Sequence, residues 1–243
     1  LLISTDISEV ISDTDFIQES IPEILEVKRK FYEILGTIVP TDVIIASSTS
    51  GLTMTEIQKF CSTPERTIIA HPFNPPYLLP LVEIVGGKKT SNSAVEWAKK
   101  FYEQAGKKPL VMNKEIPGFV ATRLQEALWR EALHMVKSGE ATPEQIDIAL
   151  KNGPAPRMVV QGQCMAFHVA CGEGGMATNL DQFGPALKLP WTRLKAPELT
   201  QALRNKMVTA CDSMAKGKSF AELAKQRDKS IVAILNAIKS SEI

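Results

Sequence analysis

A change of hydrophobic pattern about halfway along this chain of 243 residues constrains its fold more than any other feature. Up to about Lys114, short runs rich in Ile, Val and Leu alternate with stretches of helical period. From Ile116 onward the strand-like runs disappear and only helical patterns follow. Continuous apolar strands separated by helices predict a mostly parallel sheet that helices cover on both faces. We therefore expect an α/β domain over residues 1–114 and an all-helical domain over residues 115–243.

The individual elements follow from the spacing of apolar residues and from helix start and stop signals. Strands are expected at 16–21, 43–47, 67–71, 81–85 and 109–112. Helices are expected at 22–35, 54–60, 91–105, 119–137, 142–152, 163–171, 198–215 and 219–239. The helix at 142–152 has the clearest boundaries, because Thr142 is a good N-cap, Pro143 suits the first helical position and Gly153 ends the helix.

The composition argues against several classes of protein. The net charge is +1 and no run is rich in Lys and Arg, so no nucleic-acid partner is expected. No apolar stretch approaches the roughly 18 residues of a membrane span, and residues 1–6 lack the basic start of a signal peptide. The cysteines form no C-x-x-C pair, so we expect small buried side chains in a cytoplasmic protein without a metal site. They are Cys61, Cys164, Cys171 and Cys211.

No glycine-rich phosphate loop of the form G-x-G-x-x-G follows a predicted strand. The nearest cluster, Gly172-Glu173-Gly174-Gly175, lies among predicted helices and does not open a βαβ unit. We expect it to form a tight turn rather than a cradle for phosphate.

The strongest candidate for chemistry combines His71, at the end of one predicted strand, with Glu83, inside the next. Ligand sites gather at strand ends in open α/β sheets, and the chain has only three histidines. A carboxylate inside an apolar strand is costly to bury unless it is paired. If the strands are neighbours, Glu83 can accept a hydrogen bond from one imidazole nitrogen, which makes the other a better base for an alcohol proton. The alternative is a histidine that caps a strand and a glutamate that reaches solvent.

Two further polar groups follow predicted strands. The hydroxyl-rich run at 46–51 can hydrogen-bond a carboxamide or a substrate oxygen. It can equally cap a helix that starts near Thr53, with Glu56 completing a capping box. Glu23 follows the first strand and opens a helix, where it can simply complement the helix dipole.

At these residues the sequence resembles 3-hydroxyacyl-CoA dehydrogenases and their relatives. The similarity covers nearly the whole first half, in the runs FIQESIPEILEVKRKFYEIL, VIIASSTSGLTMTEI, PERTIIAHPFNPPYLLPLVEIVGG and EIPGFVATRL. It implies an α/β Rossmann-type, NAD-binding domain, N-terminally incomplete, followed by an all-α domain that forms a homodimer. It also implies that roughly 70–80 residues, with the first strand, the glycine-rich loop and the first helix, precede Leu1. Without them the chain is expected to bind NAD poorly.

The resemblance also assigns roles to single residues. It makes His71 the catalytic base, Glu83 its partner, and Ser50 the residue beside the substrate hydroxyl and the nicotinamide. The implied cofactor-binding positions are Glu23, Lys28, Ser50 and Asn74. The family usually has Asn where this chain has Thr122, which can still hydrogen-bond the substrate, and it often has Asn in place of Ser48.

The second half narrows the resemblance to one branch. The runs GPAPR at 153–157, HVACGEGGM at 168–176 and QFGPALKLPWT at 182–192 look like L-carnitine dehydrogenases, close to the L-gulonate 3-dehydrogenase and lambda-crystallin type. Those proteins act on small free hydroxy acids, so Arg157 is expected to hold a substrate carboxylate with its planar fork. Aromatic faces suit a quaternary ammonium. The candidates, each of which can equally be a core residue, are Tyr77, Phe167, Phe183 and Trp191.

The expected function is NAD-dependent oxidation of the 3-hydroxy group of a small hydroxy acid, with L-carnitine, giving 3-dehydrocarnitine, as the leading substrate. A 3-hydroxyacyl-CoA or L-gulonate is the alternative substrate within the family. A different class is a catalytically silent, crystallin-like structural dimer or an inactive fragment. The intact trio of Ser50, His71 and Glu83 favours an enzyme.

Overall fold

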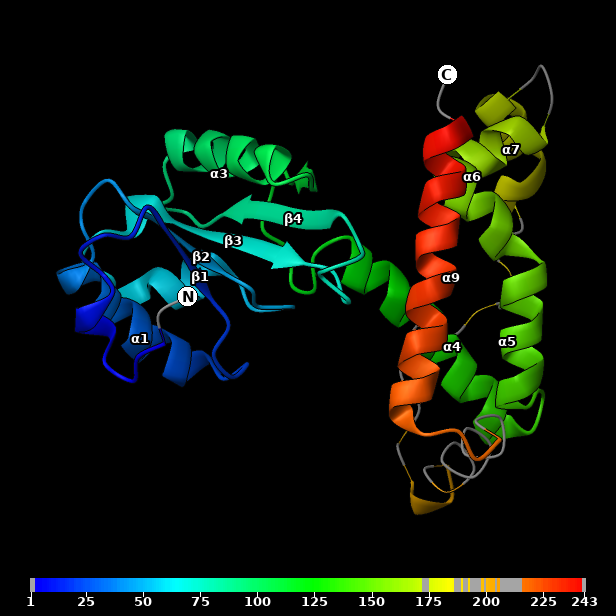
Figure 1. Ribbon diagram of the computed structural model, residues 1–243. Helices are drawn as coiled ribbons and strands as arrows, with labels where there is room; N and C mark the ends of the chain where they lie inside the picture. The colour runs from blue at the N-terminus through cyan, green and yellow to red at the C-terminus, as the bar shows by residue number, and fades with distance from the viewer. Residues whose placement is uncertain are drawn as a thin grey trace. The chain divides into compact units, whose positions relative to one another are not determined.

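The computed structural model describes residues 3–171, 175–185 and 216–241, together with 189, 192, 198, 200–203 and 205. The chain divides into two compact units, Leu1–Leu124 and Gln125–Ile243. The first unit contains a five-stranded sheet, and the second is helical (Figure 1). Residues 172–174, Trp191, Cys211 and most of the expected helix at 198–215 lie outside the described residues.

The sheet of the first unit explains why polar residues from three strands come together. Its strands stand in chain order and are β1 (Phe16–Glu19), β2 (Ile44–Ser47), β3 (Thr67–Pro72), β4 (Leu81–Gly86) and β5 (Lys108–Val111). The strands β1, β2 and β3 are parallel, so their carboxyl ends meet at one edge. The strand β4 is antiparallel to β3 and parallel to β5. The mostly parallel sheet expected from the sequence is therefore confirmed, with one reversed strand.

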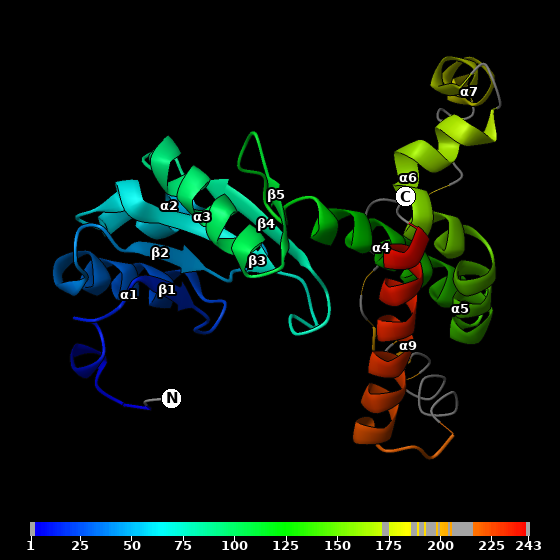
Figure 2. The ribbon, with the colours of Figure 1, turned by 45° about the horizontal axis from the view of Figure 1, so that its top comes forward.

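Helices cover both faces of this sheet (Figures 1 and 2). They are α1 (Leu25–Ile38), α2 (Met54–Ile57) and α3 (Asn92–Gln104), with the short 3-10 helices η1 (Ile7–Glu9), η2 (Gln58–Phe60) and η3 (Pro64–Arg66). On one face, Tyr32 and Leu35 of α1 pack in a core cluster with Ile45 of β2. On the other face, Ala94 and Ala98 of α3 belong to a second cluster. Burial on both faces is the reason that β2, β3 and β4 are nearly continuous apolar runs.

The starts of α3 and α2 show where local sequence signals succeed and where they fail. Ser91 caps α3, because its Oγ accepts a hydrogen bond from the Ala94 backbone N–H across 3.2 Å. Thr53 precedes α2 but makes no side-chain cap hydrogen bond. Glu56 forms an ion pair with Arg29 of α1 instead of completing a capping box. The capping-box interpretation of this segment is therefore wrong.

The second unit is helical, as the sequence predicted. Its described helices are α4 (Ala121–Ser138), which begins in the first unit, α5 (Pro143–Asn152), α6 (Pro154–Ala170), α7 (Gly175–Phe183) and α9 (Phe220–Ser241). The expected start of α5 is present, since Thr142 and Gln145 form a reciprocal capping box, and Gly153 follows its last residue. Gly162 has a φ of 69°, which only glycine adopts easily, and it kinks α6.

The three described cysteines are free thiols. Cys61 is buried, as expected, and Cys171 is half-buried. Cys164 is exposed on α6, so the expectation of a buried side chain is wrong there.

Among the described residues, no helix combines the length and the hydropathy that crossing a membrane requires.

Candidate active site

The carboxyl ends of three parallel strands carry polar residues at one edge of the sheet. The strand β1 ends at Glu19 and leads to Glu23, and β2 ends at Ser47 and leads to Ser50. The register places Glu19 beside Ser47, and β3 reaches the same edge at His71. Ligands of open α/β sheets bind at this edge, so the fold brings the predicted residues to a suitable place.

His71 and Glu83 are cross-strand partners in the structure. The antiparallel register of β3 and β4 places them directly opposite each other. The imidazole Nδ1–H of His71 donates to Glu83 Oε2 across 3.0 Å. Glu83 is fully buried, so the alternative in which it reaches solvent is wrong, while His71 keeps 7% of its surface exposed. With Nδ1 engaged, Nε2 is the ring nitrogen that can face a substrate.

The second oxygen of Glu83 holds the first turn of α4. Its Oε1 accepts the backbone N–H groups of Val120 and Ala121, each across 2.8 Å. The two preceding residues, Gly118 (φ 75°) and Phe119 (φ 48°), have left-handed backbones. That conformation strains a side chain such as phenylalanine by about 1–2 kcal/mol. The buried Phe119 ring also lies 5.5 Å from the imidazole, centroid to centroid, so this turn supports both members of the pair.

These contacts keep the Glu83 carboxylate ionised. Burial alone raises its pKa, but the hydrogen bonds from His71 and from the amides of Ala121 and Val120 outweigh burial, and the pKa is lowered below its ordinary value. An ionised carboxylate orients the imidazole and stabilises the imidazolium that forms when the ring accepts a proton. The pair therefore has the arrangement of a general base with its supporting acid.

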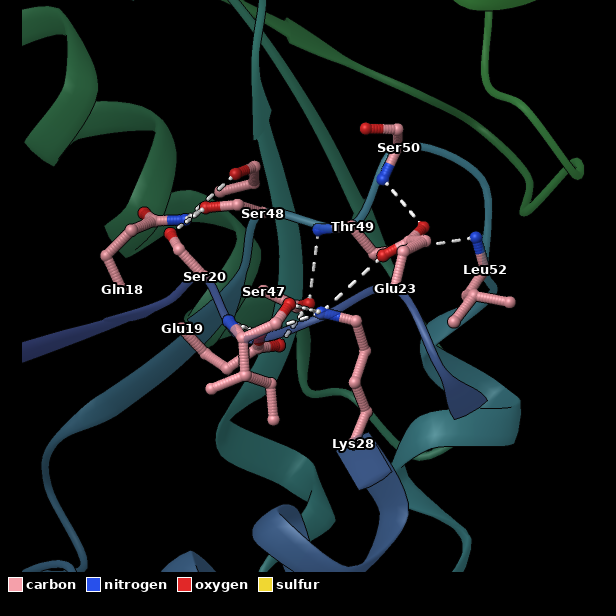
Figure 3. A network of polar contacts seen from close by, with 12 residues as sticks. Gln18, Glu19, Ser20, Glu23, Lys28, Ser47, Ser48, Thr49, Ser50 and Leu52 are labelled. Atoms are coloured by element: carbon pink, nitrogen blue, oxygen red, sulfur yellow. Dashed lines mark hydrogen bonds and ion pairs between the residues drawn. The ribbon is translucent and has the colours of Figure 1, made fainter. Parts of the chain in front are cut away.

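The loop after β2 is held by Glu23 (Figure 3). Glu23 Oε1 accepts a hydrogen bond from Thr49 Oγ1 and the backbone N–H groups of Ser50, at 3.0 Å, and Gly51, at 3.2 Å. Thr49 is buried, whereas Ser50 is exposed and its hydroxyl points away from the carboxylate in Figure 3. Glu23 thus fixes the backbone of the loop and leaves the Ser50 side chain at the surface of the strand edge.

The remaining predicted site residues differ in exposure. Lys28 is buried, and its ammonium lies inside the protein, 2.7 Å from a glutamate oxygen. Asn74 is exposed in the loop after β3, and Thr122 is half-buried in the first turn of α4. Arg157 is exposed in the first turn of α6, in the helical unit. Within the described residues of the first unit, Asn74 and Thr122 make no hydrogen bond or ion pair with another predicted site residue.

The sequence interpretation missed two residues that support the site. Glu19 is buried at the end of β1, beside Lys28. Its sequence signal is weak, because Glu19 lies between Gln18 and Ser20 at the end of a predicted strand, whereas Glu83 lies between Val82 and Ile84. Phe119 shows no such signal, because nothing in a sequence marks a phenylalanine with positive φ; only the preceding Pro117-Gly118 indicates a turn.

Comparison with known proteins identifies the chain. Residues 1–116 match the NAD binding domain of 3-hydroxyacyl-CoA dehydrogenase, and residues 118–210 match its C-terminal domain. This chain belongs to the 3-hydroxyacyl-CoA dehydrogenase family. It is 52% identical to the L-carnitine dehydrogenase of Nocardiopsis dassonvillei, over 97% of this chain and 72% of the relative. It is also 52% identical to the L-carnitine dehydrogenase of Streptomyces coelicolor, over 98% of this chain and 74% of the relative.

Solved structures agree with this family assignment. The structure of 5-formyl-3-hydroxy-2-methylpyridine 4-carboxylic acid 5-dehydrogenase, an NAD+-dependent dismutase, is similar with a TM-score of 0.80 at 26% identity. The match covers 98% of this chain and 78% of that one. As a member of the 3-hydroxyacyl-CoA dehydrogenase family, the protein is an NAD-dependent oxidoreductase. The exposed Ser50 and the Glu23 carboxylate follow the carboxyl ends of parallel strands, which is where open α/β sheets bind dinucleotides.

Proposed function

We propose that this protein oxidises the 3-hydroxy group of L-carnitine to give 3-dehydrocarnitine. The substrate class is supported by the two relatives named L-carnitine dehydrogenase, each 52% identical to this chain. The chemistry is supported by one observation above all: the hydrogen bond between His71 Nδ1 and the buried Glu83 carboxylate, at the strand edge beside the Ser50 loop. This arrangement matches what removal of an alcohol proton requires.

In the proposed mechanism, His71 Nε2 accepts the proton of the substrate hydroxyl. Glu83 keeps Nδ1 protonated and stabilises the imidazolium that results. The Ser50 hydroxyl hydrogen-bonds the substrate oxygen and holds it toward the imidazole. NAD, when bound, supplies the acceptor for the hydride that leaves C3. In this proposal the chain therefore positions the alcohol and moves its proton.

The cofactor-binding residues of the proposal are grouped around the loop after β2. Glu23 and Ser50 are the direct candidates, with Lys28 beside Glu23, its Nζ 3.6 Å from Glu23 Oε2. Asn74, exposed after β3, is the candidate on the side of His71. None of these assignments requires a metal ion, and among the described residues no group of three His, Cys, Asp or Glu side chains is arranged to hold one.

Recognition of a small zwitterion requires an anion site and a cation site. We assign the substrate carboxylate to Arg157, whose planar guanidinium matches a carboxylate, and a further hydrogen bond to Thr122. The quaternary ammonium suits an aromatic face. Tyr77, Phe167 and Phe183 are 68%, 41% and 56% exposed, so the alternative in which they are core residues is wrong. Phe167 and Phe183 share the helical unit with Arg157 and are the preferred candidates.

A homodimer formed through the helical unit is part of the same proposal. Large apolar side chains are exposed on its helices, and such surfaces commonly mark interfaces. They include Leu128, Trp129, Met165, Leu180 and Val232. We also propose a cytoplasmic location, which the free thiols of the described cysteines support, because disulfides are rare in a reducing compartment.

The test is a substrate comparison on the protein as its gene encodes it. Turnover with NAD is measured on L-carnitine, L-gulonate and 3-hydroxybutyryl-CoA under one set of conditions. We expect kcat/KM on L-carnitine to exceed both others by at least about tenfold, which corresponds to about 1.4 kcal/mol of transition-state discrimination. Best turnover on the thioester or on L-gulonate would contradict the substrate assignment. No turnover on any of the three would favour the crystallin-like alternative.

A further inference from the structure

A second glutamate, Glu19, is buried at the same sheet edge, and both of its carboxylate oxygens accept hydrogen bonds (Figure 3). Its Oε1 accepts the Lys28 ammonium across 2.7 Å and the Ile21 backbone N–H across 2.7 Å. Its Oε2 accepts the Ser47 hydroxyl across 2.6 Å. The side chains of Glu19 and Lys28 are 0% and 1% exposed. A charged pair is thus fully enclosed between the end of β1, the end of β2 and the first turns of α1.

Burying this ion pair has a high desolvation free energy, so the pair adds little net stability to the fold. Taking two charges out of water costs several kcal/mol per ion, and apolar side chains of similar volume often stabilise a protein equally well. The charge of Glu19 also acts on its surroundings: burial, and next the Glu19 carboxylate, raise the pKa of the neighbouring Tyr32 well above its usual value. A role beyond packing is therefore expected for the pair.

Two series of polar contacts connect the Glu19–Lys28 pair to the loop that carries Ser50. In the first, the Ser47 hydroxyl that donates to Glu19 also accepts the Thr49 backbone N–H across 3.2 Å. In the second, the Lys28 ammonium bonds Glu19 and lies 3.6 Å from Glu23 Oε2.

Glu23 completes the second route to the loop. Its other oxygen, Oε1, binds the Thr49 hydroxyl and the amides of Ser50 and Gly51. Among the described residues, the groups that hydrogen-bond or pair with the Glu23 carboxylate belong either to the loop or to Lys28, and Lys28 is in turn fixed by Glu19. The Glu23 side chain is 44% exposed, so the enclosed end of this route is the Glu19–Lys28 pair.

We propose that Glu19 is a positioning residue for the nicotinamide cofactor, which fixes Ser47, Lys28 and, through them, the Glu23-bound loop at 47–51. Glu19 is enclosed and touches neither cofactor nor substrate. It sets the geometry in which Ser50 and Glu23 meet the cofactor, so its loss weakens cofactor binding more than it slows the chemical step. This inference rests on the proposed assignment of Glu23 and Ser50 to the cofactor, but not on the identity of the substrate.

The test compares Glu19→Gln, Ser47→Ala and the double variant with the protein as its gene encodes it. The dissociation constant for NADH is measured by calorimetry at a temperature where circular dichroism shows each variant to be folded, and Tm is measured separately. We expect Glu19→Gln to weaken NADH binding about 10- to 100-fold and Ser47→Ala about 3- to 10-fold. Because both act through one network, the double variant is expected to lose less than the product of the single effects.

Matched variants separate positioning from general destabilisation. Glu26→Gln, on the exposed face of α1, is the control and is expected to bind NADH like the wild type. If Glu19→Gln does not fold, Ser47→Ala carries the test, because it leaves the Glu19–Lys28 ion pair intact. At saturating NAD, kcat of Glu19→Gln is expected to stay within about threefold of the wild type, with the defect in KM for NAD.

A lowered Tm with an unchanged NADH dissociation constant in both variants would overturn the inference, because the pair would then serve only the fold. Strictly multiplicative effects of the two substitutions would overturn the coupling through Ser47. Failure of the proposed function gives a different result: an inactive protein on L-carnitine whose NADH affinity still depends on Glu19 rejects the substrate and retains the positioning role.

Discussion

Two fully buried glutamates stand at the same sheet edge, and their partners distinguish what each can do. Glu83 binds the imidazole of His71 with one oxygen and two backbone amides of α4 with the other. Glu19 binds the ammonium of Lys28 with one oxygen and the hydroxyl of Ser47 with the other. An imidazole changes charge near neutral pH and retains a second nitrogen that can accept a proton, whereas an enclosed ammonium can only donate hydrogen bonds to the groups around it.

The same device, a carboxylate buried in a strand, therefore serves two purposes. Beside a partly exposed imidazole it supports proton transfer, and beside an enclosed ammonium it supports the shape of a loop. Replacing each glutamate by a neutral residue should consequently affect different properties, kcat for Glu83 and NADH affinity for Glu19. The following predictions test that difference and the support of the Glu83 carboxylate, on the protein as its gene encodes it.

Replacing His71 by Gln has the largest expected effect. The variant loses the group that accepts the hydroxyl proton, so kcat is expected to fall about 10²- to 10⁴-fold. The NADH dissociation constant, measured by calorimetry, is expected to stay within about threefold of the wild type, because the loop at 47–51 keeps its contacts with Glu23 and Glu19. The exposed His168 in the helical unit supplies the control, and His168→Gln should turn over normally. Near-normal turnover of His71→Gln would exclude His71 as the base.

Replacing Glu83 by Gln is expected to reduce kcat about 10-fold to 10²-fold, less than loss of the base itself. The amide can still contact Nδ1–H, but it carries no charge to stabilise the imidazolium. NADH affinity again serves as the second measurement and should change little. A variant with normal kcat but weak NADH binding would show that Glu83, like Glu19, is a positioning residue.

Replacing Gly118 by Ala tests the strained turn that supports Glu83. A side chain at φ 75° is disfavoured, and the added Cβ would lie 3.3 Å from Arg123 Cγ. The free energy of unfolding is expected to fall by about 1–2 kcal/mol, as measured by urea denaturation. Gly106 has the same φ with no neighbour within 4 Å of an added Cβ, so Gly106→Ala is the matched control for backbone strain. We expect only Gly118→Ala to lower kcat as well, and equal kcat in both variants would exclude a role for the turn in catalysis.

The smallest expected effect is the change in the free energy of unfolding at acidic pH. The pKa of Glu83 is lowered in the folded protein, so its ionised form stabilises the fold above the ordinary value of about 4.5, and that contribution is lost as the pH falls through the lowered pKa. The difference in unfolding free energy between the wild type and Glu83→Gln should therefore be constant above about pH 5 and shrink below pH 4.5. Urea denaturation at pH 7, 5, 4 and 3 measures this difference. A difference that grows toward low pH would contradict a lowered pKa of Glu83 in the folded protein.

Much of the fold and the central pair could be predicted from the sequence. Strands buried on both faces produce continuous apolar runs, and a glutamate such as Glu83 stands out in them because burial without a partner is costly. The start of α5 could be predicted because Thr142 and Pro143 favour a helix start through contacts with their neighbours in the sequence. In each case the determining physics lies within a few residues along the chain.

The rest could not be predicted, because it depends on contacts between distant segments. The reversal of β4, which places Glu83 opposite His71, follows from how the loop after β3 folds back and leaves no local pattern. Thr53 is of a residue type that often caps helices, but its side chain makes no cap hydrogen bond here. Glu56, the expected partner in the capping box, forms a tertiary ion pair with Arg29 instead. Glu19 lies between the polar residues Gln18 and Ser20, so no local pattern marks it, and only the three-dimensional contact with Lys28 shows the network to which it belongs.

The most direct test of the division between the two glutamates measures kcat at saturating NAD and substrate, together with the NADH dissociation constant, for Glu83→Gln and Glu19→Gln side by side. We predict a large loss of kcat with nearly normal NADH affinity for Glu83→Gln, and the reverse for Glu19→Gln. If both variants lose kcat and NADH affinity in the same proportion, the two buried carboxylates do not have separate roles, and the contrast between a catalytic pair and a positioning pair is wrong.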